Sequence, residues 1–270
     1  MKNSLKRTYK LCKRELVGED KIDTFEIVKA VERHRQFWKP NRIRIILLAE
    51  SHKHTTKKRF LVDYNKYKST KSLATQKCPS EYVRFVYCLG YGEIDLLNNS
   101  HLLEDKNGGT PQFWKIFYSC CNKISKDKDF HPILKDKKSG IPLEGRLKNK
   151  LDLLNKLKDR GIWLVDASII GIDRKNPKTK KKVLKCCWQN YTKNLLRSLN
   201  PEHVIIIGKG VGKVIKNDLE NDLAISCSVI KQPEGCRKPG EKLKNLKQLN
   251  KIVFGHIKNE TATGLFSPIF

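Results

Sequence analysis

The first clear run of apolar residues along the chain predicts a buried strand. Ile43 and residues 45–49 are apolar, and only Arg44 interrupts them. Such a near-continuous run is typical of a parallel strand that helices cover on both faces. It ends abruptly in Glu50, Ser51, His52, Lys53 and His54. Ligands of open α/β sheets bind beyond the carboxyl ends of strands, so this polar stretch is a candidate site. The alternative is a solvated loop in which Ser51 caps a helix.

Later apolar runs predict further strands, and amphipathic segments lie between them. The runs at 161–168, 203–212 and 224–235 predict strands, whereas Tyr82–Leu89 fits either a strand or a buried helix. Helical patterns cover residues 24–38, 110–124, 151–157, 183–199 and 242–254, and residues 125–150 form a polar excursion. This alternation predicts an α/β fold, a three-layer α/β/α arrangement with a central, mainly parallel sheet of about four strands. We expect a single domain over residues 1–270, with its core at about 40–240 and a basic N-terminal segment at 1–20.

The charge balance adds a prediction about partners. The chain of 270 residues holds 56 Lys and Arg against 28 Asp and Glu, which gives a formal charge of +28. The basic residues form local clusters such as KRTYKLCKR, KKR and KTKKK. This excess predicts salt-dependent attraction to polyanions, and DNA, or alternatively RNA, is the expected partner.

The composition also bears on location and on cofactors. No apolar stretch approaches the length of a membrane span, and the N-terminus lacks an apolar signal core, so we expect an intracellular protein without a membrane partner. The nine cysteines are then expected to be reduced thiols, and no CxxC motif occurs. His52 and His54 supply only two metal ligands, so we expect no metal and no other cofactor.

Polar groups follow several predicted strands, and a parallel sheet would bring them to one edge. Glu50 and Asp166 are carboxylates at two such ends, and Gln232 lies at a third. One carboxylate would activate water or stabilise a cation while the other binds the ligand. Each carboxylate equally fits the role of a helix cap. The GKGVGK segment after the fourth run predicts a tight strand-to-helix turn, with anion binding as the alternative.

Basic and polar residues around these strand ends are the candidate contacts for nucleic acid. Rings at Phe60, Tyr64 and Tyr67 lie among lysines, which suits either base stacking or anchoring of the loop. The predicted nucleic-acid contacts are Ser51, His52, Lys53, Lys57, Lys58, Arg59, Ser168, Lys180, Lys181, Lys182, Lys209 and Arg237.

The order of these elements resembles the uracil-DNA glycosylase superfamily over roughly residues 40–240. LLAESHKH looks like the loop with the sequence hydrophobic-Gly-Glu-Ala-Pro-Gly in the thermophilic-type branch, which puts Glu50 at the acidic position. TPQFWKIFYSCCNKI is similar to the helix after the base-stacking segment. KLKDRGIWLVDASIIGI resembles the unit whose Asn holds the uracil edge, which puts Asp166 at that position. VIKQPEGCRKPG falls where the family has its His-Pro-Ser-Pro minor-groove loop.

The resemblance implies hydrolysis of the N-glycosidic bond of a flipped base, with Glu50, Asp166 and Gln232 as the catalytic residues. The sequence departs from the family in three ways. Asp166 replaces the Asn, Gln232 replaces a His that would stabilise the uracil anion, and the four cluster cysteines of the branch are not matched at their usual spacing. These departures imply either that another base is removed or that the protein is a catalytically inactive binding module. A nucleotide-handling enzyme that uses GKGVGK is a third alternative.

Overall fold

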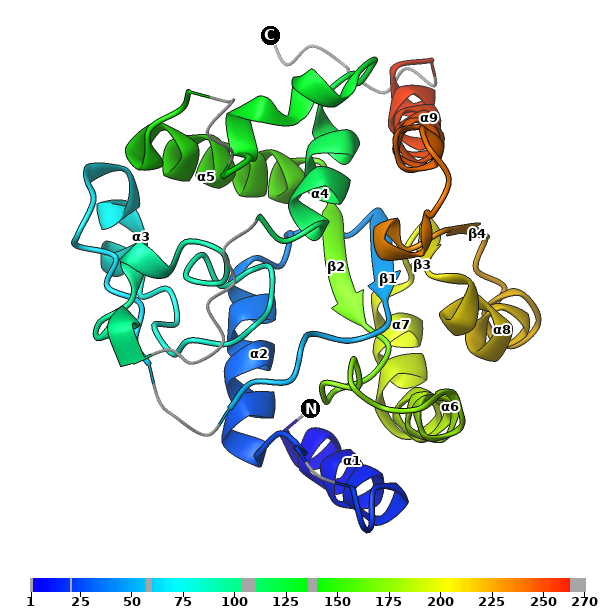
Figure 1. Ribbon diagram of the computed structural model, residues 1–270. Helices are drawn as coiled ribbons and strands as arrows, with labels where there is room; N and C mark the ends of the chain where they lie inside the picture. Colours follow the sequence, from blue (N-terminus) through cyan, green and yellow to red (C-terminus); the bar gives the residue numbers. More distant parts are fainter. Residues whose placement is uncertain (1, 20, 57–59, 103–109, 136–139, 263–270) are drawn as a thin grey trace, which may run out of the picture.

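A central sheet of four parallel strands organises the structure, a computed structural model that describes residues 2–19, 21–56, 60–102, 110–135 and 140–262 (Figure 1). The strands lie in the order β2-β1-β3-β4. Their bounds are Ile45–Ala49 for β1, Ile162–Asp166 for β2, His203–Ile207 for β3 and Cys227–Ile230 for β4. Every residue of β1, β2 and β3 is buried. Their apolar sequences are therefore explained by burial on both faces.

Helices cover both faces of this sheet, and this confirms the predicted three-layer α/β/α fold. The connection from β1 to β2 moves toward one edge of the sheet, whereas the connections from β2 to β3 and from β3 to β4 move toward the other. Because parallel crossovers are right-handed, opposite directions place their helices on opposite faces. The helices are α1 (Lys2–Glu15), α2 (Phe25–Phe37), α3 (Lys71–Thr75), α4 (Phe113–Cys121), α5 (Leu143–Asp159), α6 (Pro177–Cys187), α7 (Lys193–Leu199), α8 (Lys209–Asn217) and α9 (Glu241–Ala262).

The strand order identifies where a ligand site belongs. The chain leaves β1 toward β2 and later leaves β3 toward β4, so the direction of the order reverses between β1 and β3. Ile45 pairs with Ile162 on one side and with His203 on the other, which aligns the carboxyl ends of the three strands. Crevices at such a reversal, beyond the carboxyl ends, are where open α/β sheets bind ligands. None of the described helices combines the length and apolarity that crossing a membrane requires.

The segment Tyr82–Leu89 forms neither the strand nor the helix that its apolar sequence suggested. It is a series of buried turns, in which the N–H groups of Phe85 and Cys88 donate to the carbonyls of Val83 and Phe85. The hydroxyl of Tyr87 accepts a hydrogen bond from the Leu164 N–H of β2 at 2.9 Å. The apolar composition thus reflects packing of an irregular segment beside the sheet, because burial alone does not fix backbone conformation.

Two more stretches differ from the sequence-based interpretation. The lysine-rich run at 178–182 precedes the helical pattern predicted at 183–199, yet it lies on α6, since the Asn176 side chain caps the helix by accepting the Thr179 N–H at 2.9 Å. The polar excursion at 125–150 includes a 3₁₀ turn at Asp127–Ile133 and the start of α5. In both stretches, helix capping and packing produce helical structure although the high average polarity of the residues is typical of a loop.

A buried ionic cluster fixes to α5 the irregular segment, which we take as residues 82–93 because no helix or strand lies within them and the next element begins at Ile94. Glu93 is fully buried, and it accepts hydrogen bonds from Arg146 Nε and Nη2 at 2.7 and 2.8 Å. Lys150, also fully buried, donates to Glu93 Oε1 at 2.6 Å. Burial lowers the pKa of Lys150 to about 8, although Glu93 opposes this shift. The cluster holds two cations on one carboxylate, so removal of that carboxylate would leave two buried charges without compensation.

Substitution of Glu93 by Gln should therefore lower the free energy of unfolding by about 3–5 kcal/mol. Urea denaturation at neutral pH measures this change. The matched control is Asp222→Asn, which breaks the exposed pair of Lys193 and Asp222 and should cost less than about 1 kcal/mol. Equal effects of the two substitutions would contradict the importance of the buried cluster.

Candidate functional site

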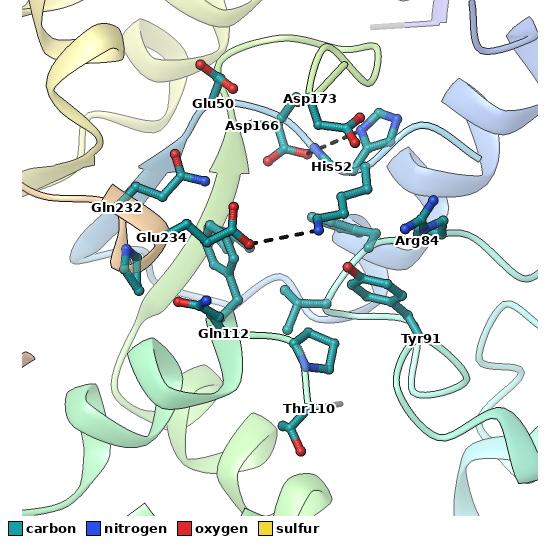
Figure 2. A pocket seen from close by; sticks show the side chains of 18 of the residues that line it. Glu50, His52, Arg84, Tyr91, Thr110, Gln112, Asp166, Asp173, Gln232 and Glu234 are labelled. Carbon is teal, nitrogen blue, oxygen red and sulfur yellow. Dashed lines mark hydrogen bonds and ion pairs between the residues drawn. The ribbon is translucent and has the colours of Figure 1, made fainter. Parts of the chain in front are cut away.

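A cavity of about 320 Å³ opens at the carboxyl ends of the strands (Figure 2). Glu50 follows β1, Asp166 ends β2, and Gln232 follows β4; all three line this cavity although they are far apart in sequence. The volume falls at the lower end of the range for small-molecule sites. We call this cavity the main pocket. Its residues are Glu50, Ser51, His52, Lys53, Arg84, Phe85, Val86, Tyr91, Thr110, Pro111, Gln112, Phe113, Leu164, Asp166, Asp173, Lys180, Gln232, Pro233 and Glu234.

Charged groups around the main pocket form pairs. Lys180 Nζ of α6 lies 3.0 Å from Glu50 Oε2, and both side chains are only partly exposed, at 25% and 20%. Lys53 Nζ lies 3.8 Å from Glu234 Oε1 at a more open position (Figure 2). The lining holds four carboxylates and three Lys or Arg side chains, whereas the whole chain has two basic residues for each acidic one. The main pocket is therefore a less basic region within a strongly basic protein.

Behind the main pocket, the His52 side chain lies fully buried between two carboxylates. Its Nε2 is 3.0 Å from Asp23 Oδ2, and its Nδ1 is 3.4 Å from Asp166 Oδ2. The backbone N–H of His52 also donates to Asp166 Oδ2 at 2.9 Å. One imidazole thus joins Asp23, two residues before α2, to Asp166, the last residue of β2. We call this arrangement the Asp23–His52–Asp166 array.

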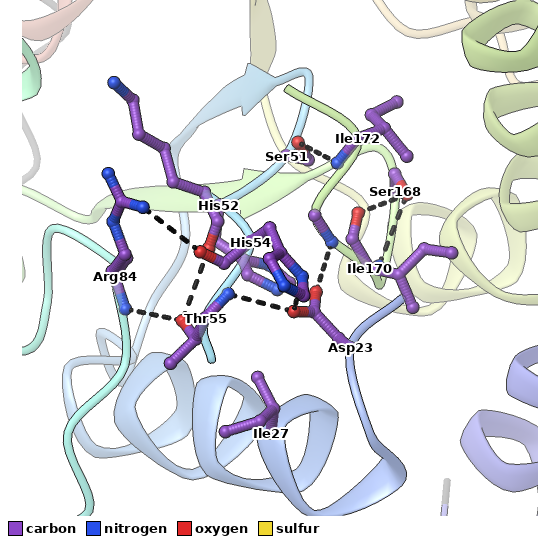
Figure 3. A network of polar contacts seen from close by, with 12 residues as sticks. Asp23, Ile27, Ser51, His52, His54, Thr55, Arg84, Ser168, Ile170 and Ile172 are labelled. Atoms are coloured by element: carbon purple, nitrogen blue, oxygen red, sulfur yellow. Dashed lines mark hydrogen bonds and ion pairs between the residues drawn. The ribbon is translucent and has the colours of Figure 1, made fainter. Parts of the chain in front are cut away.

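Asp23 is held by several further donors (Figure 3). The N–H groups of Thr55 and Gly171 donate to its two oxygens at 3.0 and 2.5 Å, and His54 Nδ1 lies 2.9 Å from Oδ1. Gly171 approaches so closely that a Cβ there would lie 2.6 Å from the His54 nitrogen. The carboxylate therefore fixes three loop segments in one arrangement, and the close approach explains a glycine at position 171.

The array changes the protonation of its members. Burial alone would lower the pKa of His52, but the neighbouring carboxylates of Asp166 and Asp23 outweigh it and raise the pKa to about 9. Burial would raise the pKa of Asp23, yet the two histidines and the Gly171 N–H hold it well below its ordinary value. His52 is consequently an imidazolium at neutral pH, and it neutralises part of the charge of the two carboxylates.

The structure brings most of the predicted site residues to this edge. Ser51, His52, Lys53 and Lys180 line the main pocket. The Ser51 hydroxyl caps no helix; it accepts the Ile172 N–H at 3.2 Å. Lys181 and Lys182 are exposed on α6, and Arg237 is exposed after β4. Lys57, Lys58 and Arg59 lie outside the described residues.

Ser168 does not fit its predicted role as a contact for nucleic acid. Its side chain is fully buried and donates to the Ile170 carbonyl at 2.8 Å. The loop after β2 turns back on itself there, so the hydroxyl faces the protein interior. Phe60 and Tyr64 are also buried, which shows that these rings anchor their loop rather than offer surfaces for stacking.

The GKGVGK segment forms the tight strand-to-helix turn that its sequence predicted. Gly208 takes a φ of 116°, which favours glycine, and α8 begins at Lys209. Beside this turn lies a second hollow of about 340 Å³, which shares Glu50 and Gln232 with the main pocket. Lys209 lines this second hollow with Lys231. Glu50 and Gln232 thus stand between the main pocket and a more basic hollow.

Several residues of the main pocket and of the Asp23–His52–Asp166 array were not predicted as site residues from the sequence. Asp23 stands directly before the helical pattern predicted at 24–38, and Thr24 beside it caps the helix, since its side chain accepts the Ile27 N–H. Arg84 and Tyr91 come from the irregular segment, where no strand end marked them. Glu234 follows the predicted residue Gln232 by two positions. Among these missed residues, it alone could have been predicted, because it is a charged residue at the end of a predicted strand.

Neither a metal site within the described part of the chain nor a match to known proteins is found. Among the residues that the structure describes, no group of three or more His, Cys, Asp or Glu side chains is placed to hold a metal ion. Both His52 and His54 contact Asp23. Comparisons with family models, with curated proteins and with solved structures gave no match. The chemistry of the site must therefore be argued from its own residues.

The raised pKa of His52 predicts a pH-dependent contribution to stability. The folded protein keeps a proton that the unfolded chain releases above about pH 6.5, so the contribution of His52 is complete below that pH and is lost as pH rises through about 9. The free energy of unfolding of the wild type, relative to His52→Gln, should fall by about 3 kcal/mol across this window. Denaturation at a series of pH values measures the difference.

The control for this experiment is His101→Gln, at an exposed histidine, which should keep the pH profile of the wild type. Lys150 and the buried thiols titrate alike in the wild type and in His52→Gln, so their contributions to the pH dependence of stability cancel in the difference. Parallel profiles for the wild type and His52→Gln would show that His52 is not charged in the folded protein.

Proposed function

We propose that the main pocket binds a nucleobase extruded from nucleic acid and that the protein hydrolyses the N-glycosidic bond of that nucleotide. The observation that carries the proposal is the convergence of Glu50, Asp166 and Gln232 on one cavity at the reversal of strand order. A base inside a duplex must leave the stack to reach such a cavity, and basic flanks must hold the phosphates on either side. Lys180, Lys181 and Lys182 on α6 supply charge next to the opening.

The lining of the main pocket suits a flat, partly polar ligand. Phe85, Tyr91 and Phe113 offer aromatic surface, and Gln112 and Gln232 offer amide donors and acceptors. Aromatic contacts and hydrogen bonds to the polar edge are how enzymes hold an extruded base. The volume of about 320 Å³ admits one base rather than a dinucleotide cofactor.

Glu50 has the central chemical role in this proposal. As the C1′–N bond breaks, the base takes the bonding electron pair and positive charge develops on the sugar, which a nearby carboxylate stabilises. A water molecule then adds its oxygen to C1′ and gives its proton to Glu50 or to solvent. Lys180, 3.0 Å from Glu50, fixes the carboxylate and also lies where a flanking phosphate would pass.

The charges of the main pocket favour a base that leaves as a neutral molecule. Asp166 would repel an anionic base, and Gln232 offers no positive charge to stabilise one. A purine methylated on its imidazole ring is already cationic, so its departure as a neutral base needs no cation. The four carboxylates of the lining balance Lys53, Arg84, Lys180 and the His52 imidazolium, so the main pocket carries no net positive charge that would exclude that cationic base.

A lesion panel tests this proposal. Oligonucleotides that contain uracil, hypoxanthine, xanthine or a ring-methylated purine are incubated with the wild type, and abasic sites are detected by strand cleavage in alkali. The methylated purine should be released fastest, and Glu50→Gln should slow release at least about 100-fold, as expected for the loss of a catalytic carboxylate. The control Glu202→Gln changes an acid at the amino end of β3, bonded to Arg42 and Arg44, and should keep full activity.

A second candidate function is nucleic-acid binding without catalysis. It is favoured by the pairing of Glu50 with Lys180 and of Asp166 with His52, because both carboxylates already have cationic partners. Intact strands with every lesion, under conditions where the oligonucleotide is bound, would support this candidate and contradict hydrolysis.

The dependence of binding on salt tests the proposed partner separately. For duplex DNA, removal of one lysine that binds a phosphate should reduce the slope of log affinity against log salt concentration by about 0.9. Replacement of Lys178, Lys181 and Lys182 of α6 by Gln should therefore flatten the slope in a fluorescence anisotropy titration. Replacement of the exposed Lys148, Lys156 and Lys247 of α5 and α9, away from the carboxyl edge, is the control with equal charge change. Equal slopes for both triple variants would contradict binding at this edge.

A further inference from the structure

Three cysteine thiols meet where α1 packs on α6, away from the main pocket. Cys12 Sγ lies 3.2 Å from Cys187 Sγ and 3.7 Å from Cys186 Sγ, although 174 residues separate Cys12 from Cys186. Cys12 and Cys187 are buried, whereas Cys186 is partly exposed. One end of the cluster is therefore open to small molecules in solution, and the other is enclosed by the protein.

The distances allow a covalent bond with little rearrangement. Sulfur atoms in a disulfide lie about 2.05 Å apart, so Cys12 and Cys186 need to approach by about 1.7 Å. Rotation of the partly exposed Cys186 side chain accounts for a movement of this size. The bond would join the N-terminal helix α1 to α6, which are adjacent in Figure 1.

The two thiols have different proton affinities. The Cys12 S–H donates to Cys186 Sγ, and this hydrogen bond lowers the pKa of Cys186 despite partial burial and the charge of Glu15. The same contacts with Cys186 and Cys187, together with burial, raise the pKa of Cys12. Cys186 is thus the thiol that more readily forms the nucleophilic thiolate, while Cys12 keeps its proton.

We propose that a peroxide oxidises Cys186 and that Cys12 then closes a reversible disulfide between α1 and α6. In the first step the Cys186 thiolate attacks one peroxide oxygen, the O–O bond breaks, and a sulfenic acid and hydroxide form. In the second step Cys12 sulfur attacks the sulfenic sulfur, the S–O bond breaks, and the thiol proton leaves with the hydroxyl as water. The peroxide gains two electrons, and each sulfur supplies one.

Two other cysteines provide matched controls. Cys227 and Cys236 are partly exposed like Cys186. However, the Cys227 thiol donates to the Glu220 carboxylate, and the Cys236 thiol donates to the backbone carbonyl of Gln232. Burial raises the pKa of Cys227 to about 11 and also raises the pKa of Cys236. Both should react more slowly with peroxide because the thiolate is the reactive form.

Treatment of the full chain with hydrogen peroxide tests the proposal. Peptide mapping by mass spectrometry should find a cross-link between Cys12 and Cys186, which dithiothreitol removes. The melting temperature should rise by about 5 °C or more, because the bond restricts a long loop of the unfolded chain. Cys186→Ser should abolish the cross-link, and Cys12→Ser should accumulate a sulfenic acid at Cys186 that dimedone traps. Cys227→Ser and Cys236→Ser should behave as the wild type.

Three results would overturn the proposal. One is peroxide reaction of Cys227 or Cys236 as fast as that of Cys186. Another is further oxidation of Cys186 without any cross-link to Cys12. The third is a cross-link between Cys12 and Cys187 that forms at the wild-type rate in Cys186→Ser, because Cys186 would then not be the point of entry. The readouts require no nucleic acid, so they are independent of the proposed hydrolase activity.

Discussion

The side chain of His52 is held between Asp23 and Asp166, and this contact joins the start of α2, the loop after β1 and the end of β2. Glu50 and Ser51 lie on the same short loop as His52, so the array also determines where these two residues face the main pocket. Burial of charges is costly unless each is compensated. Here a cation between two carboxylates, with N–H donors from Thr55 and Gly171, provides that compensation.

A second buried ionic group supports another part of the lining of the main pocket. Glu93, with Arg146 and Lys150, fixes the irregular segment to α5, and that segment carries Arg84, Phe85 and Tyr91 into the main pocket. Both ionic groups hold the segments that they join in one arrangement, because displacement of either partner would leave a buried charge without compensation. The main pocket therefore has walls built from loops that are nevertheless well defined, which suits a site that must hold a ligand in one orientation.

The sequence predicted those parts of the structure in which burial determines both the local pattern of residues and the fold. Buried parallel strands need apolar runs, so β1, β2 and β3 were recognisable, and the convergence of Glu50, Asp166 and Gln232 followed from the common direction of the strands. The contact of Asp23 with His52 was not predictable in this way. It joins residues 29 positions apart, and the sequence near Asp23 resembles an ordinary helix cap. The turns at Tyr82–Leu89 were missed because an apolar run indicates burial without specifying backbone conformation.

The proposed hydrolysis depends on the electrostatic state of this site. With His52 as an imidazolium, Asp166 is compensated from behind, and Glu50 remains the carboxylate closest to the second, basic hollow. Nitrogen NMR of the His52 ring across a pH titration tests this state most directly. We expect a doubly protonated ring at neutral pH that loses its proton near pH 9. A ring that is neutral at pH 7 and titrates at or below its ordinary pKa of 6.5 would contradict it.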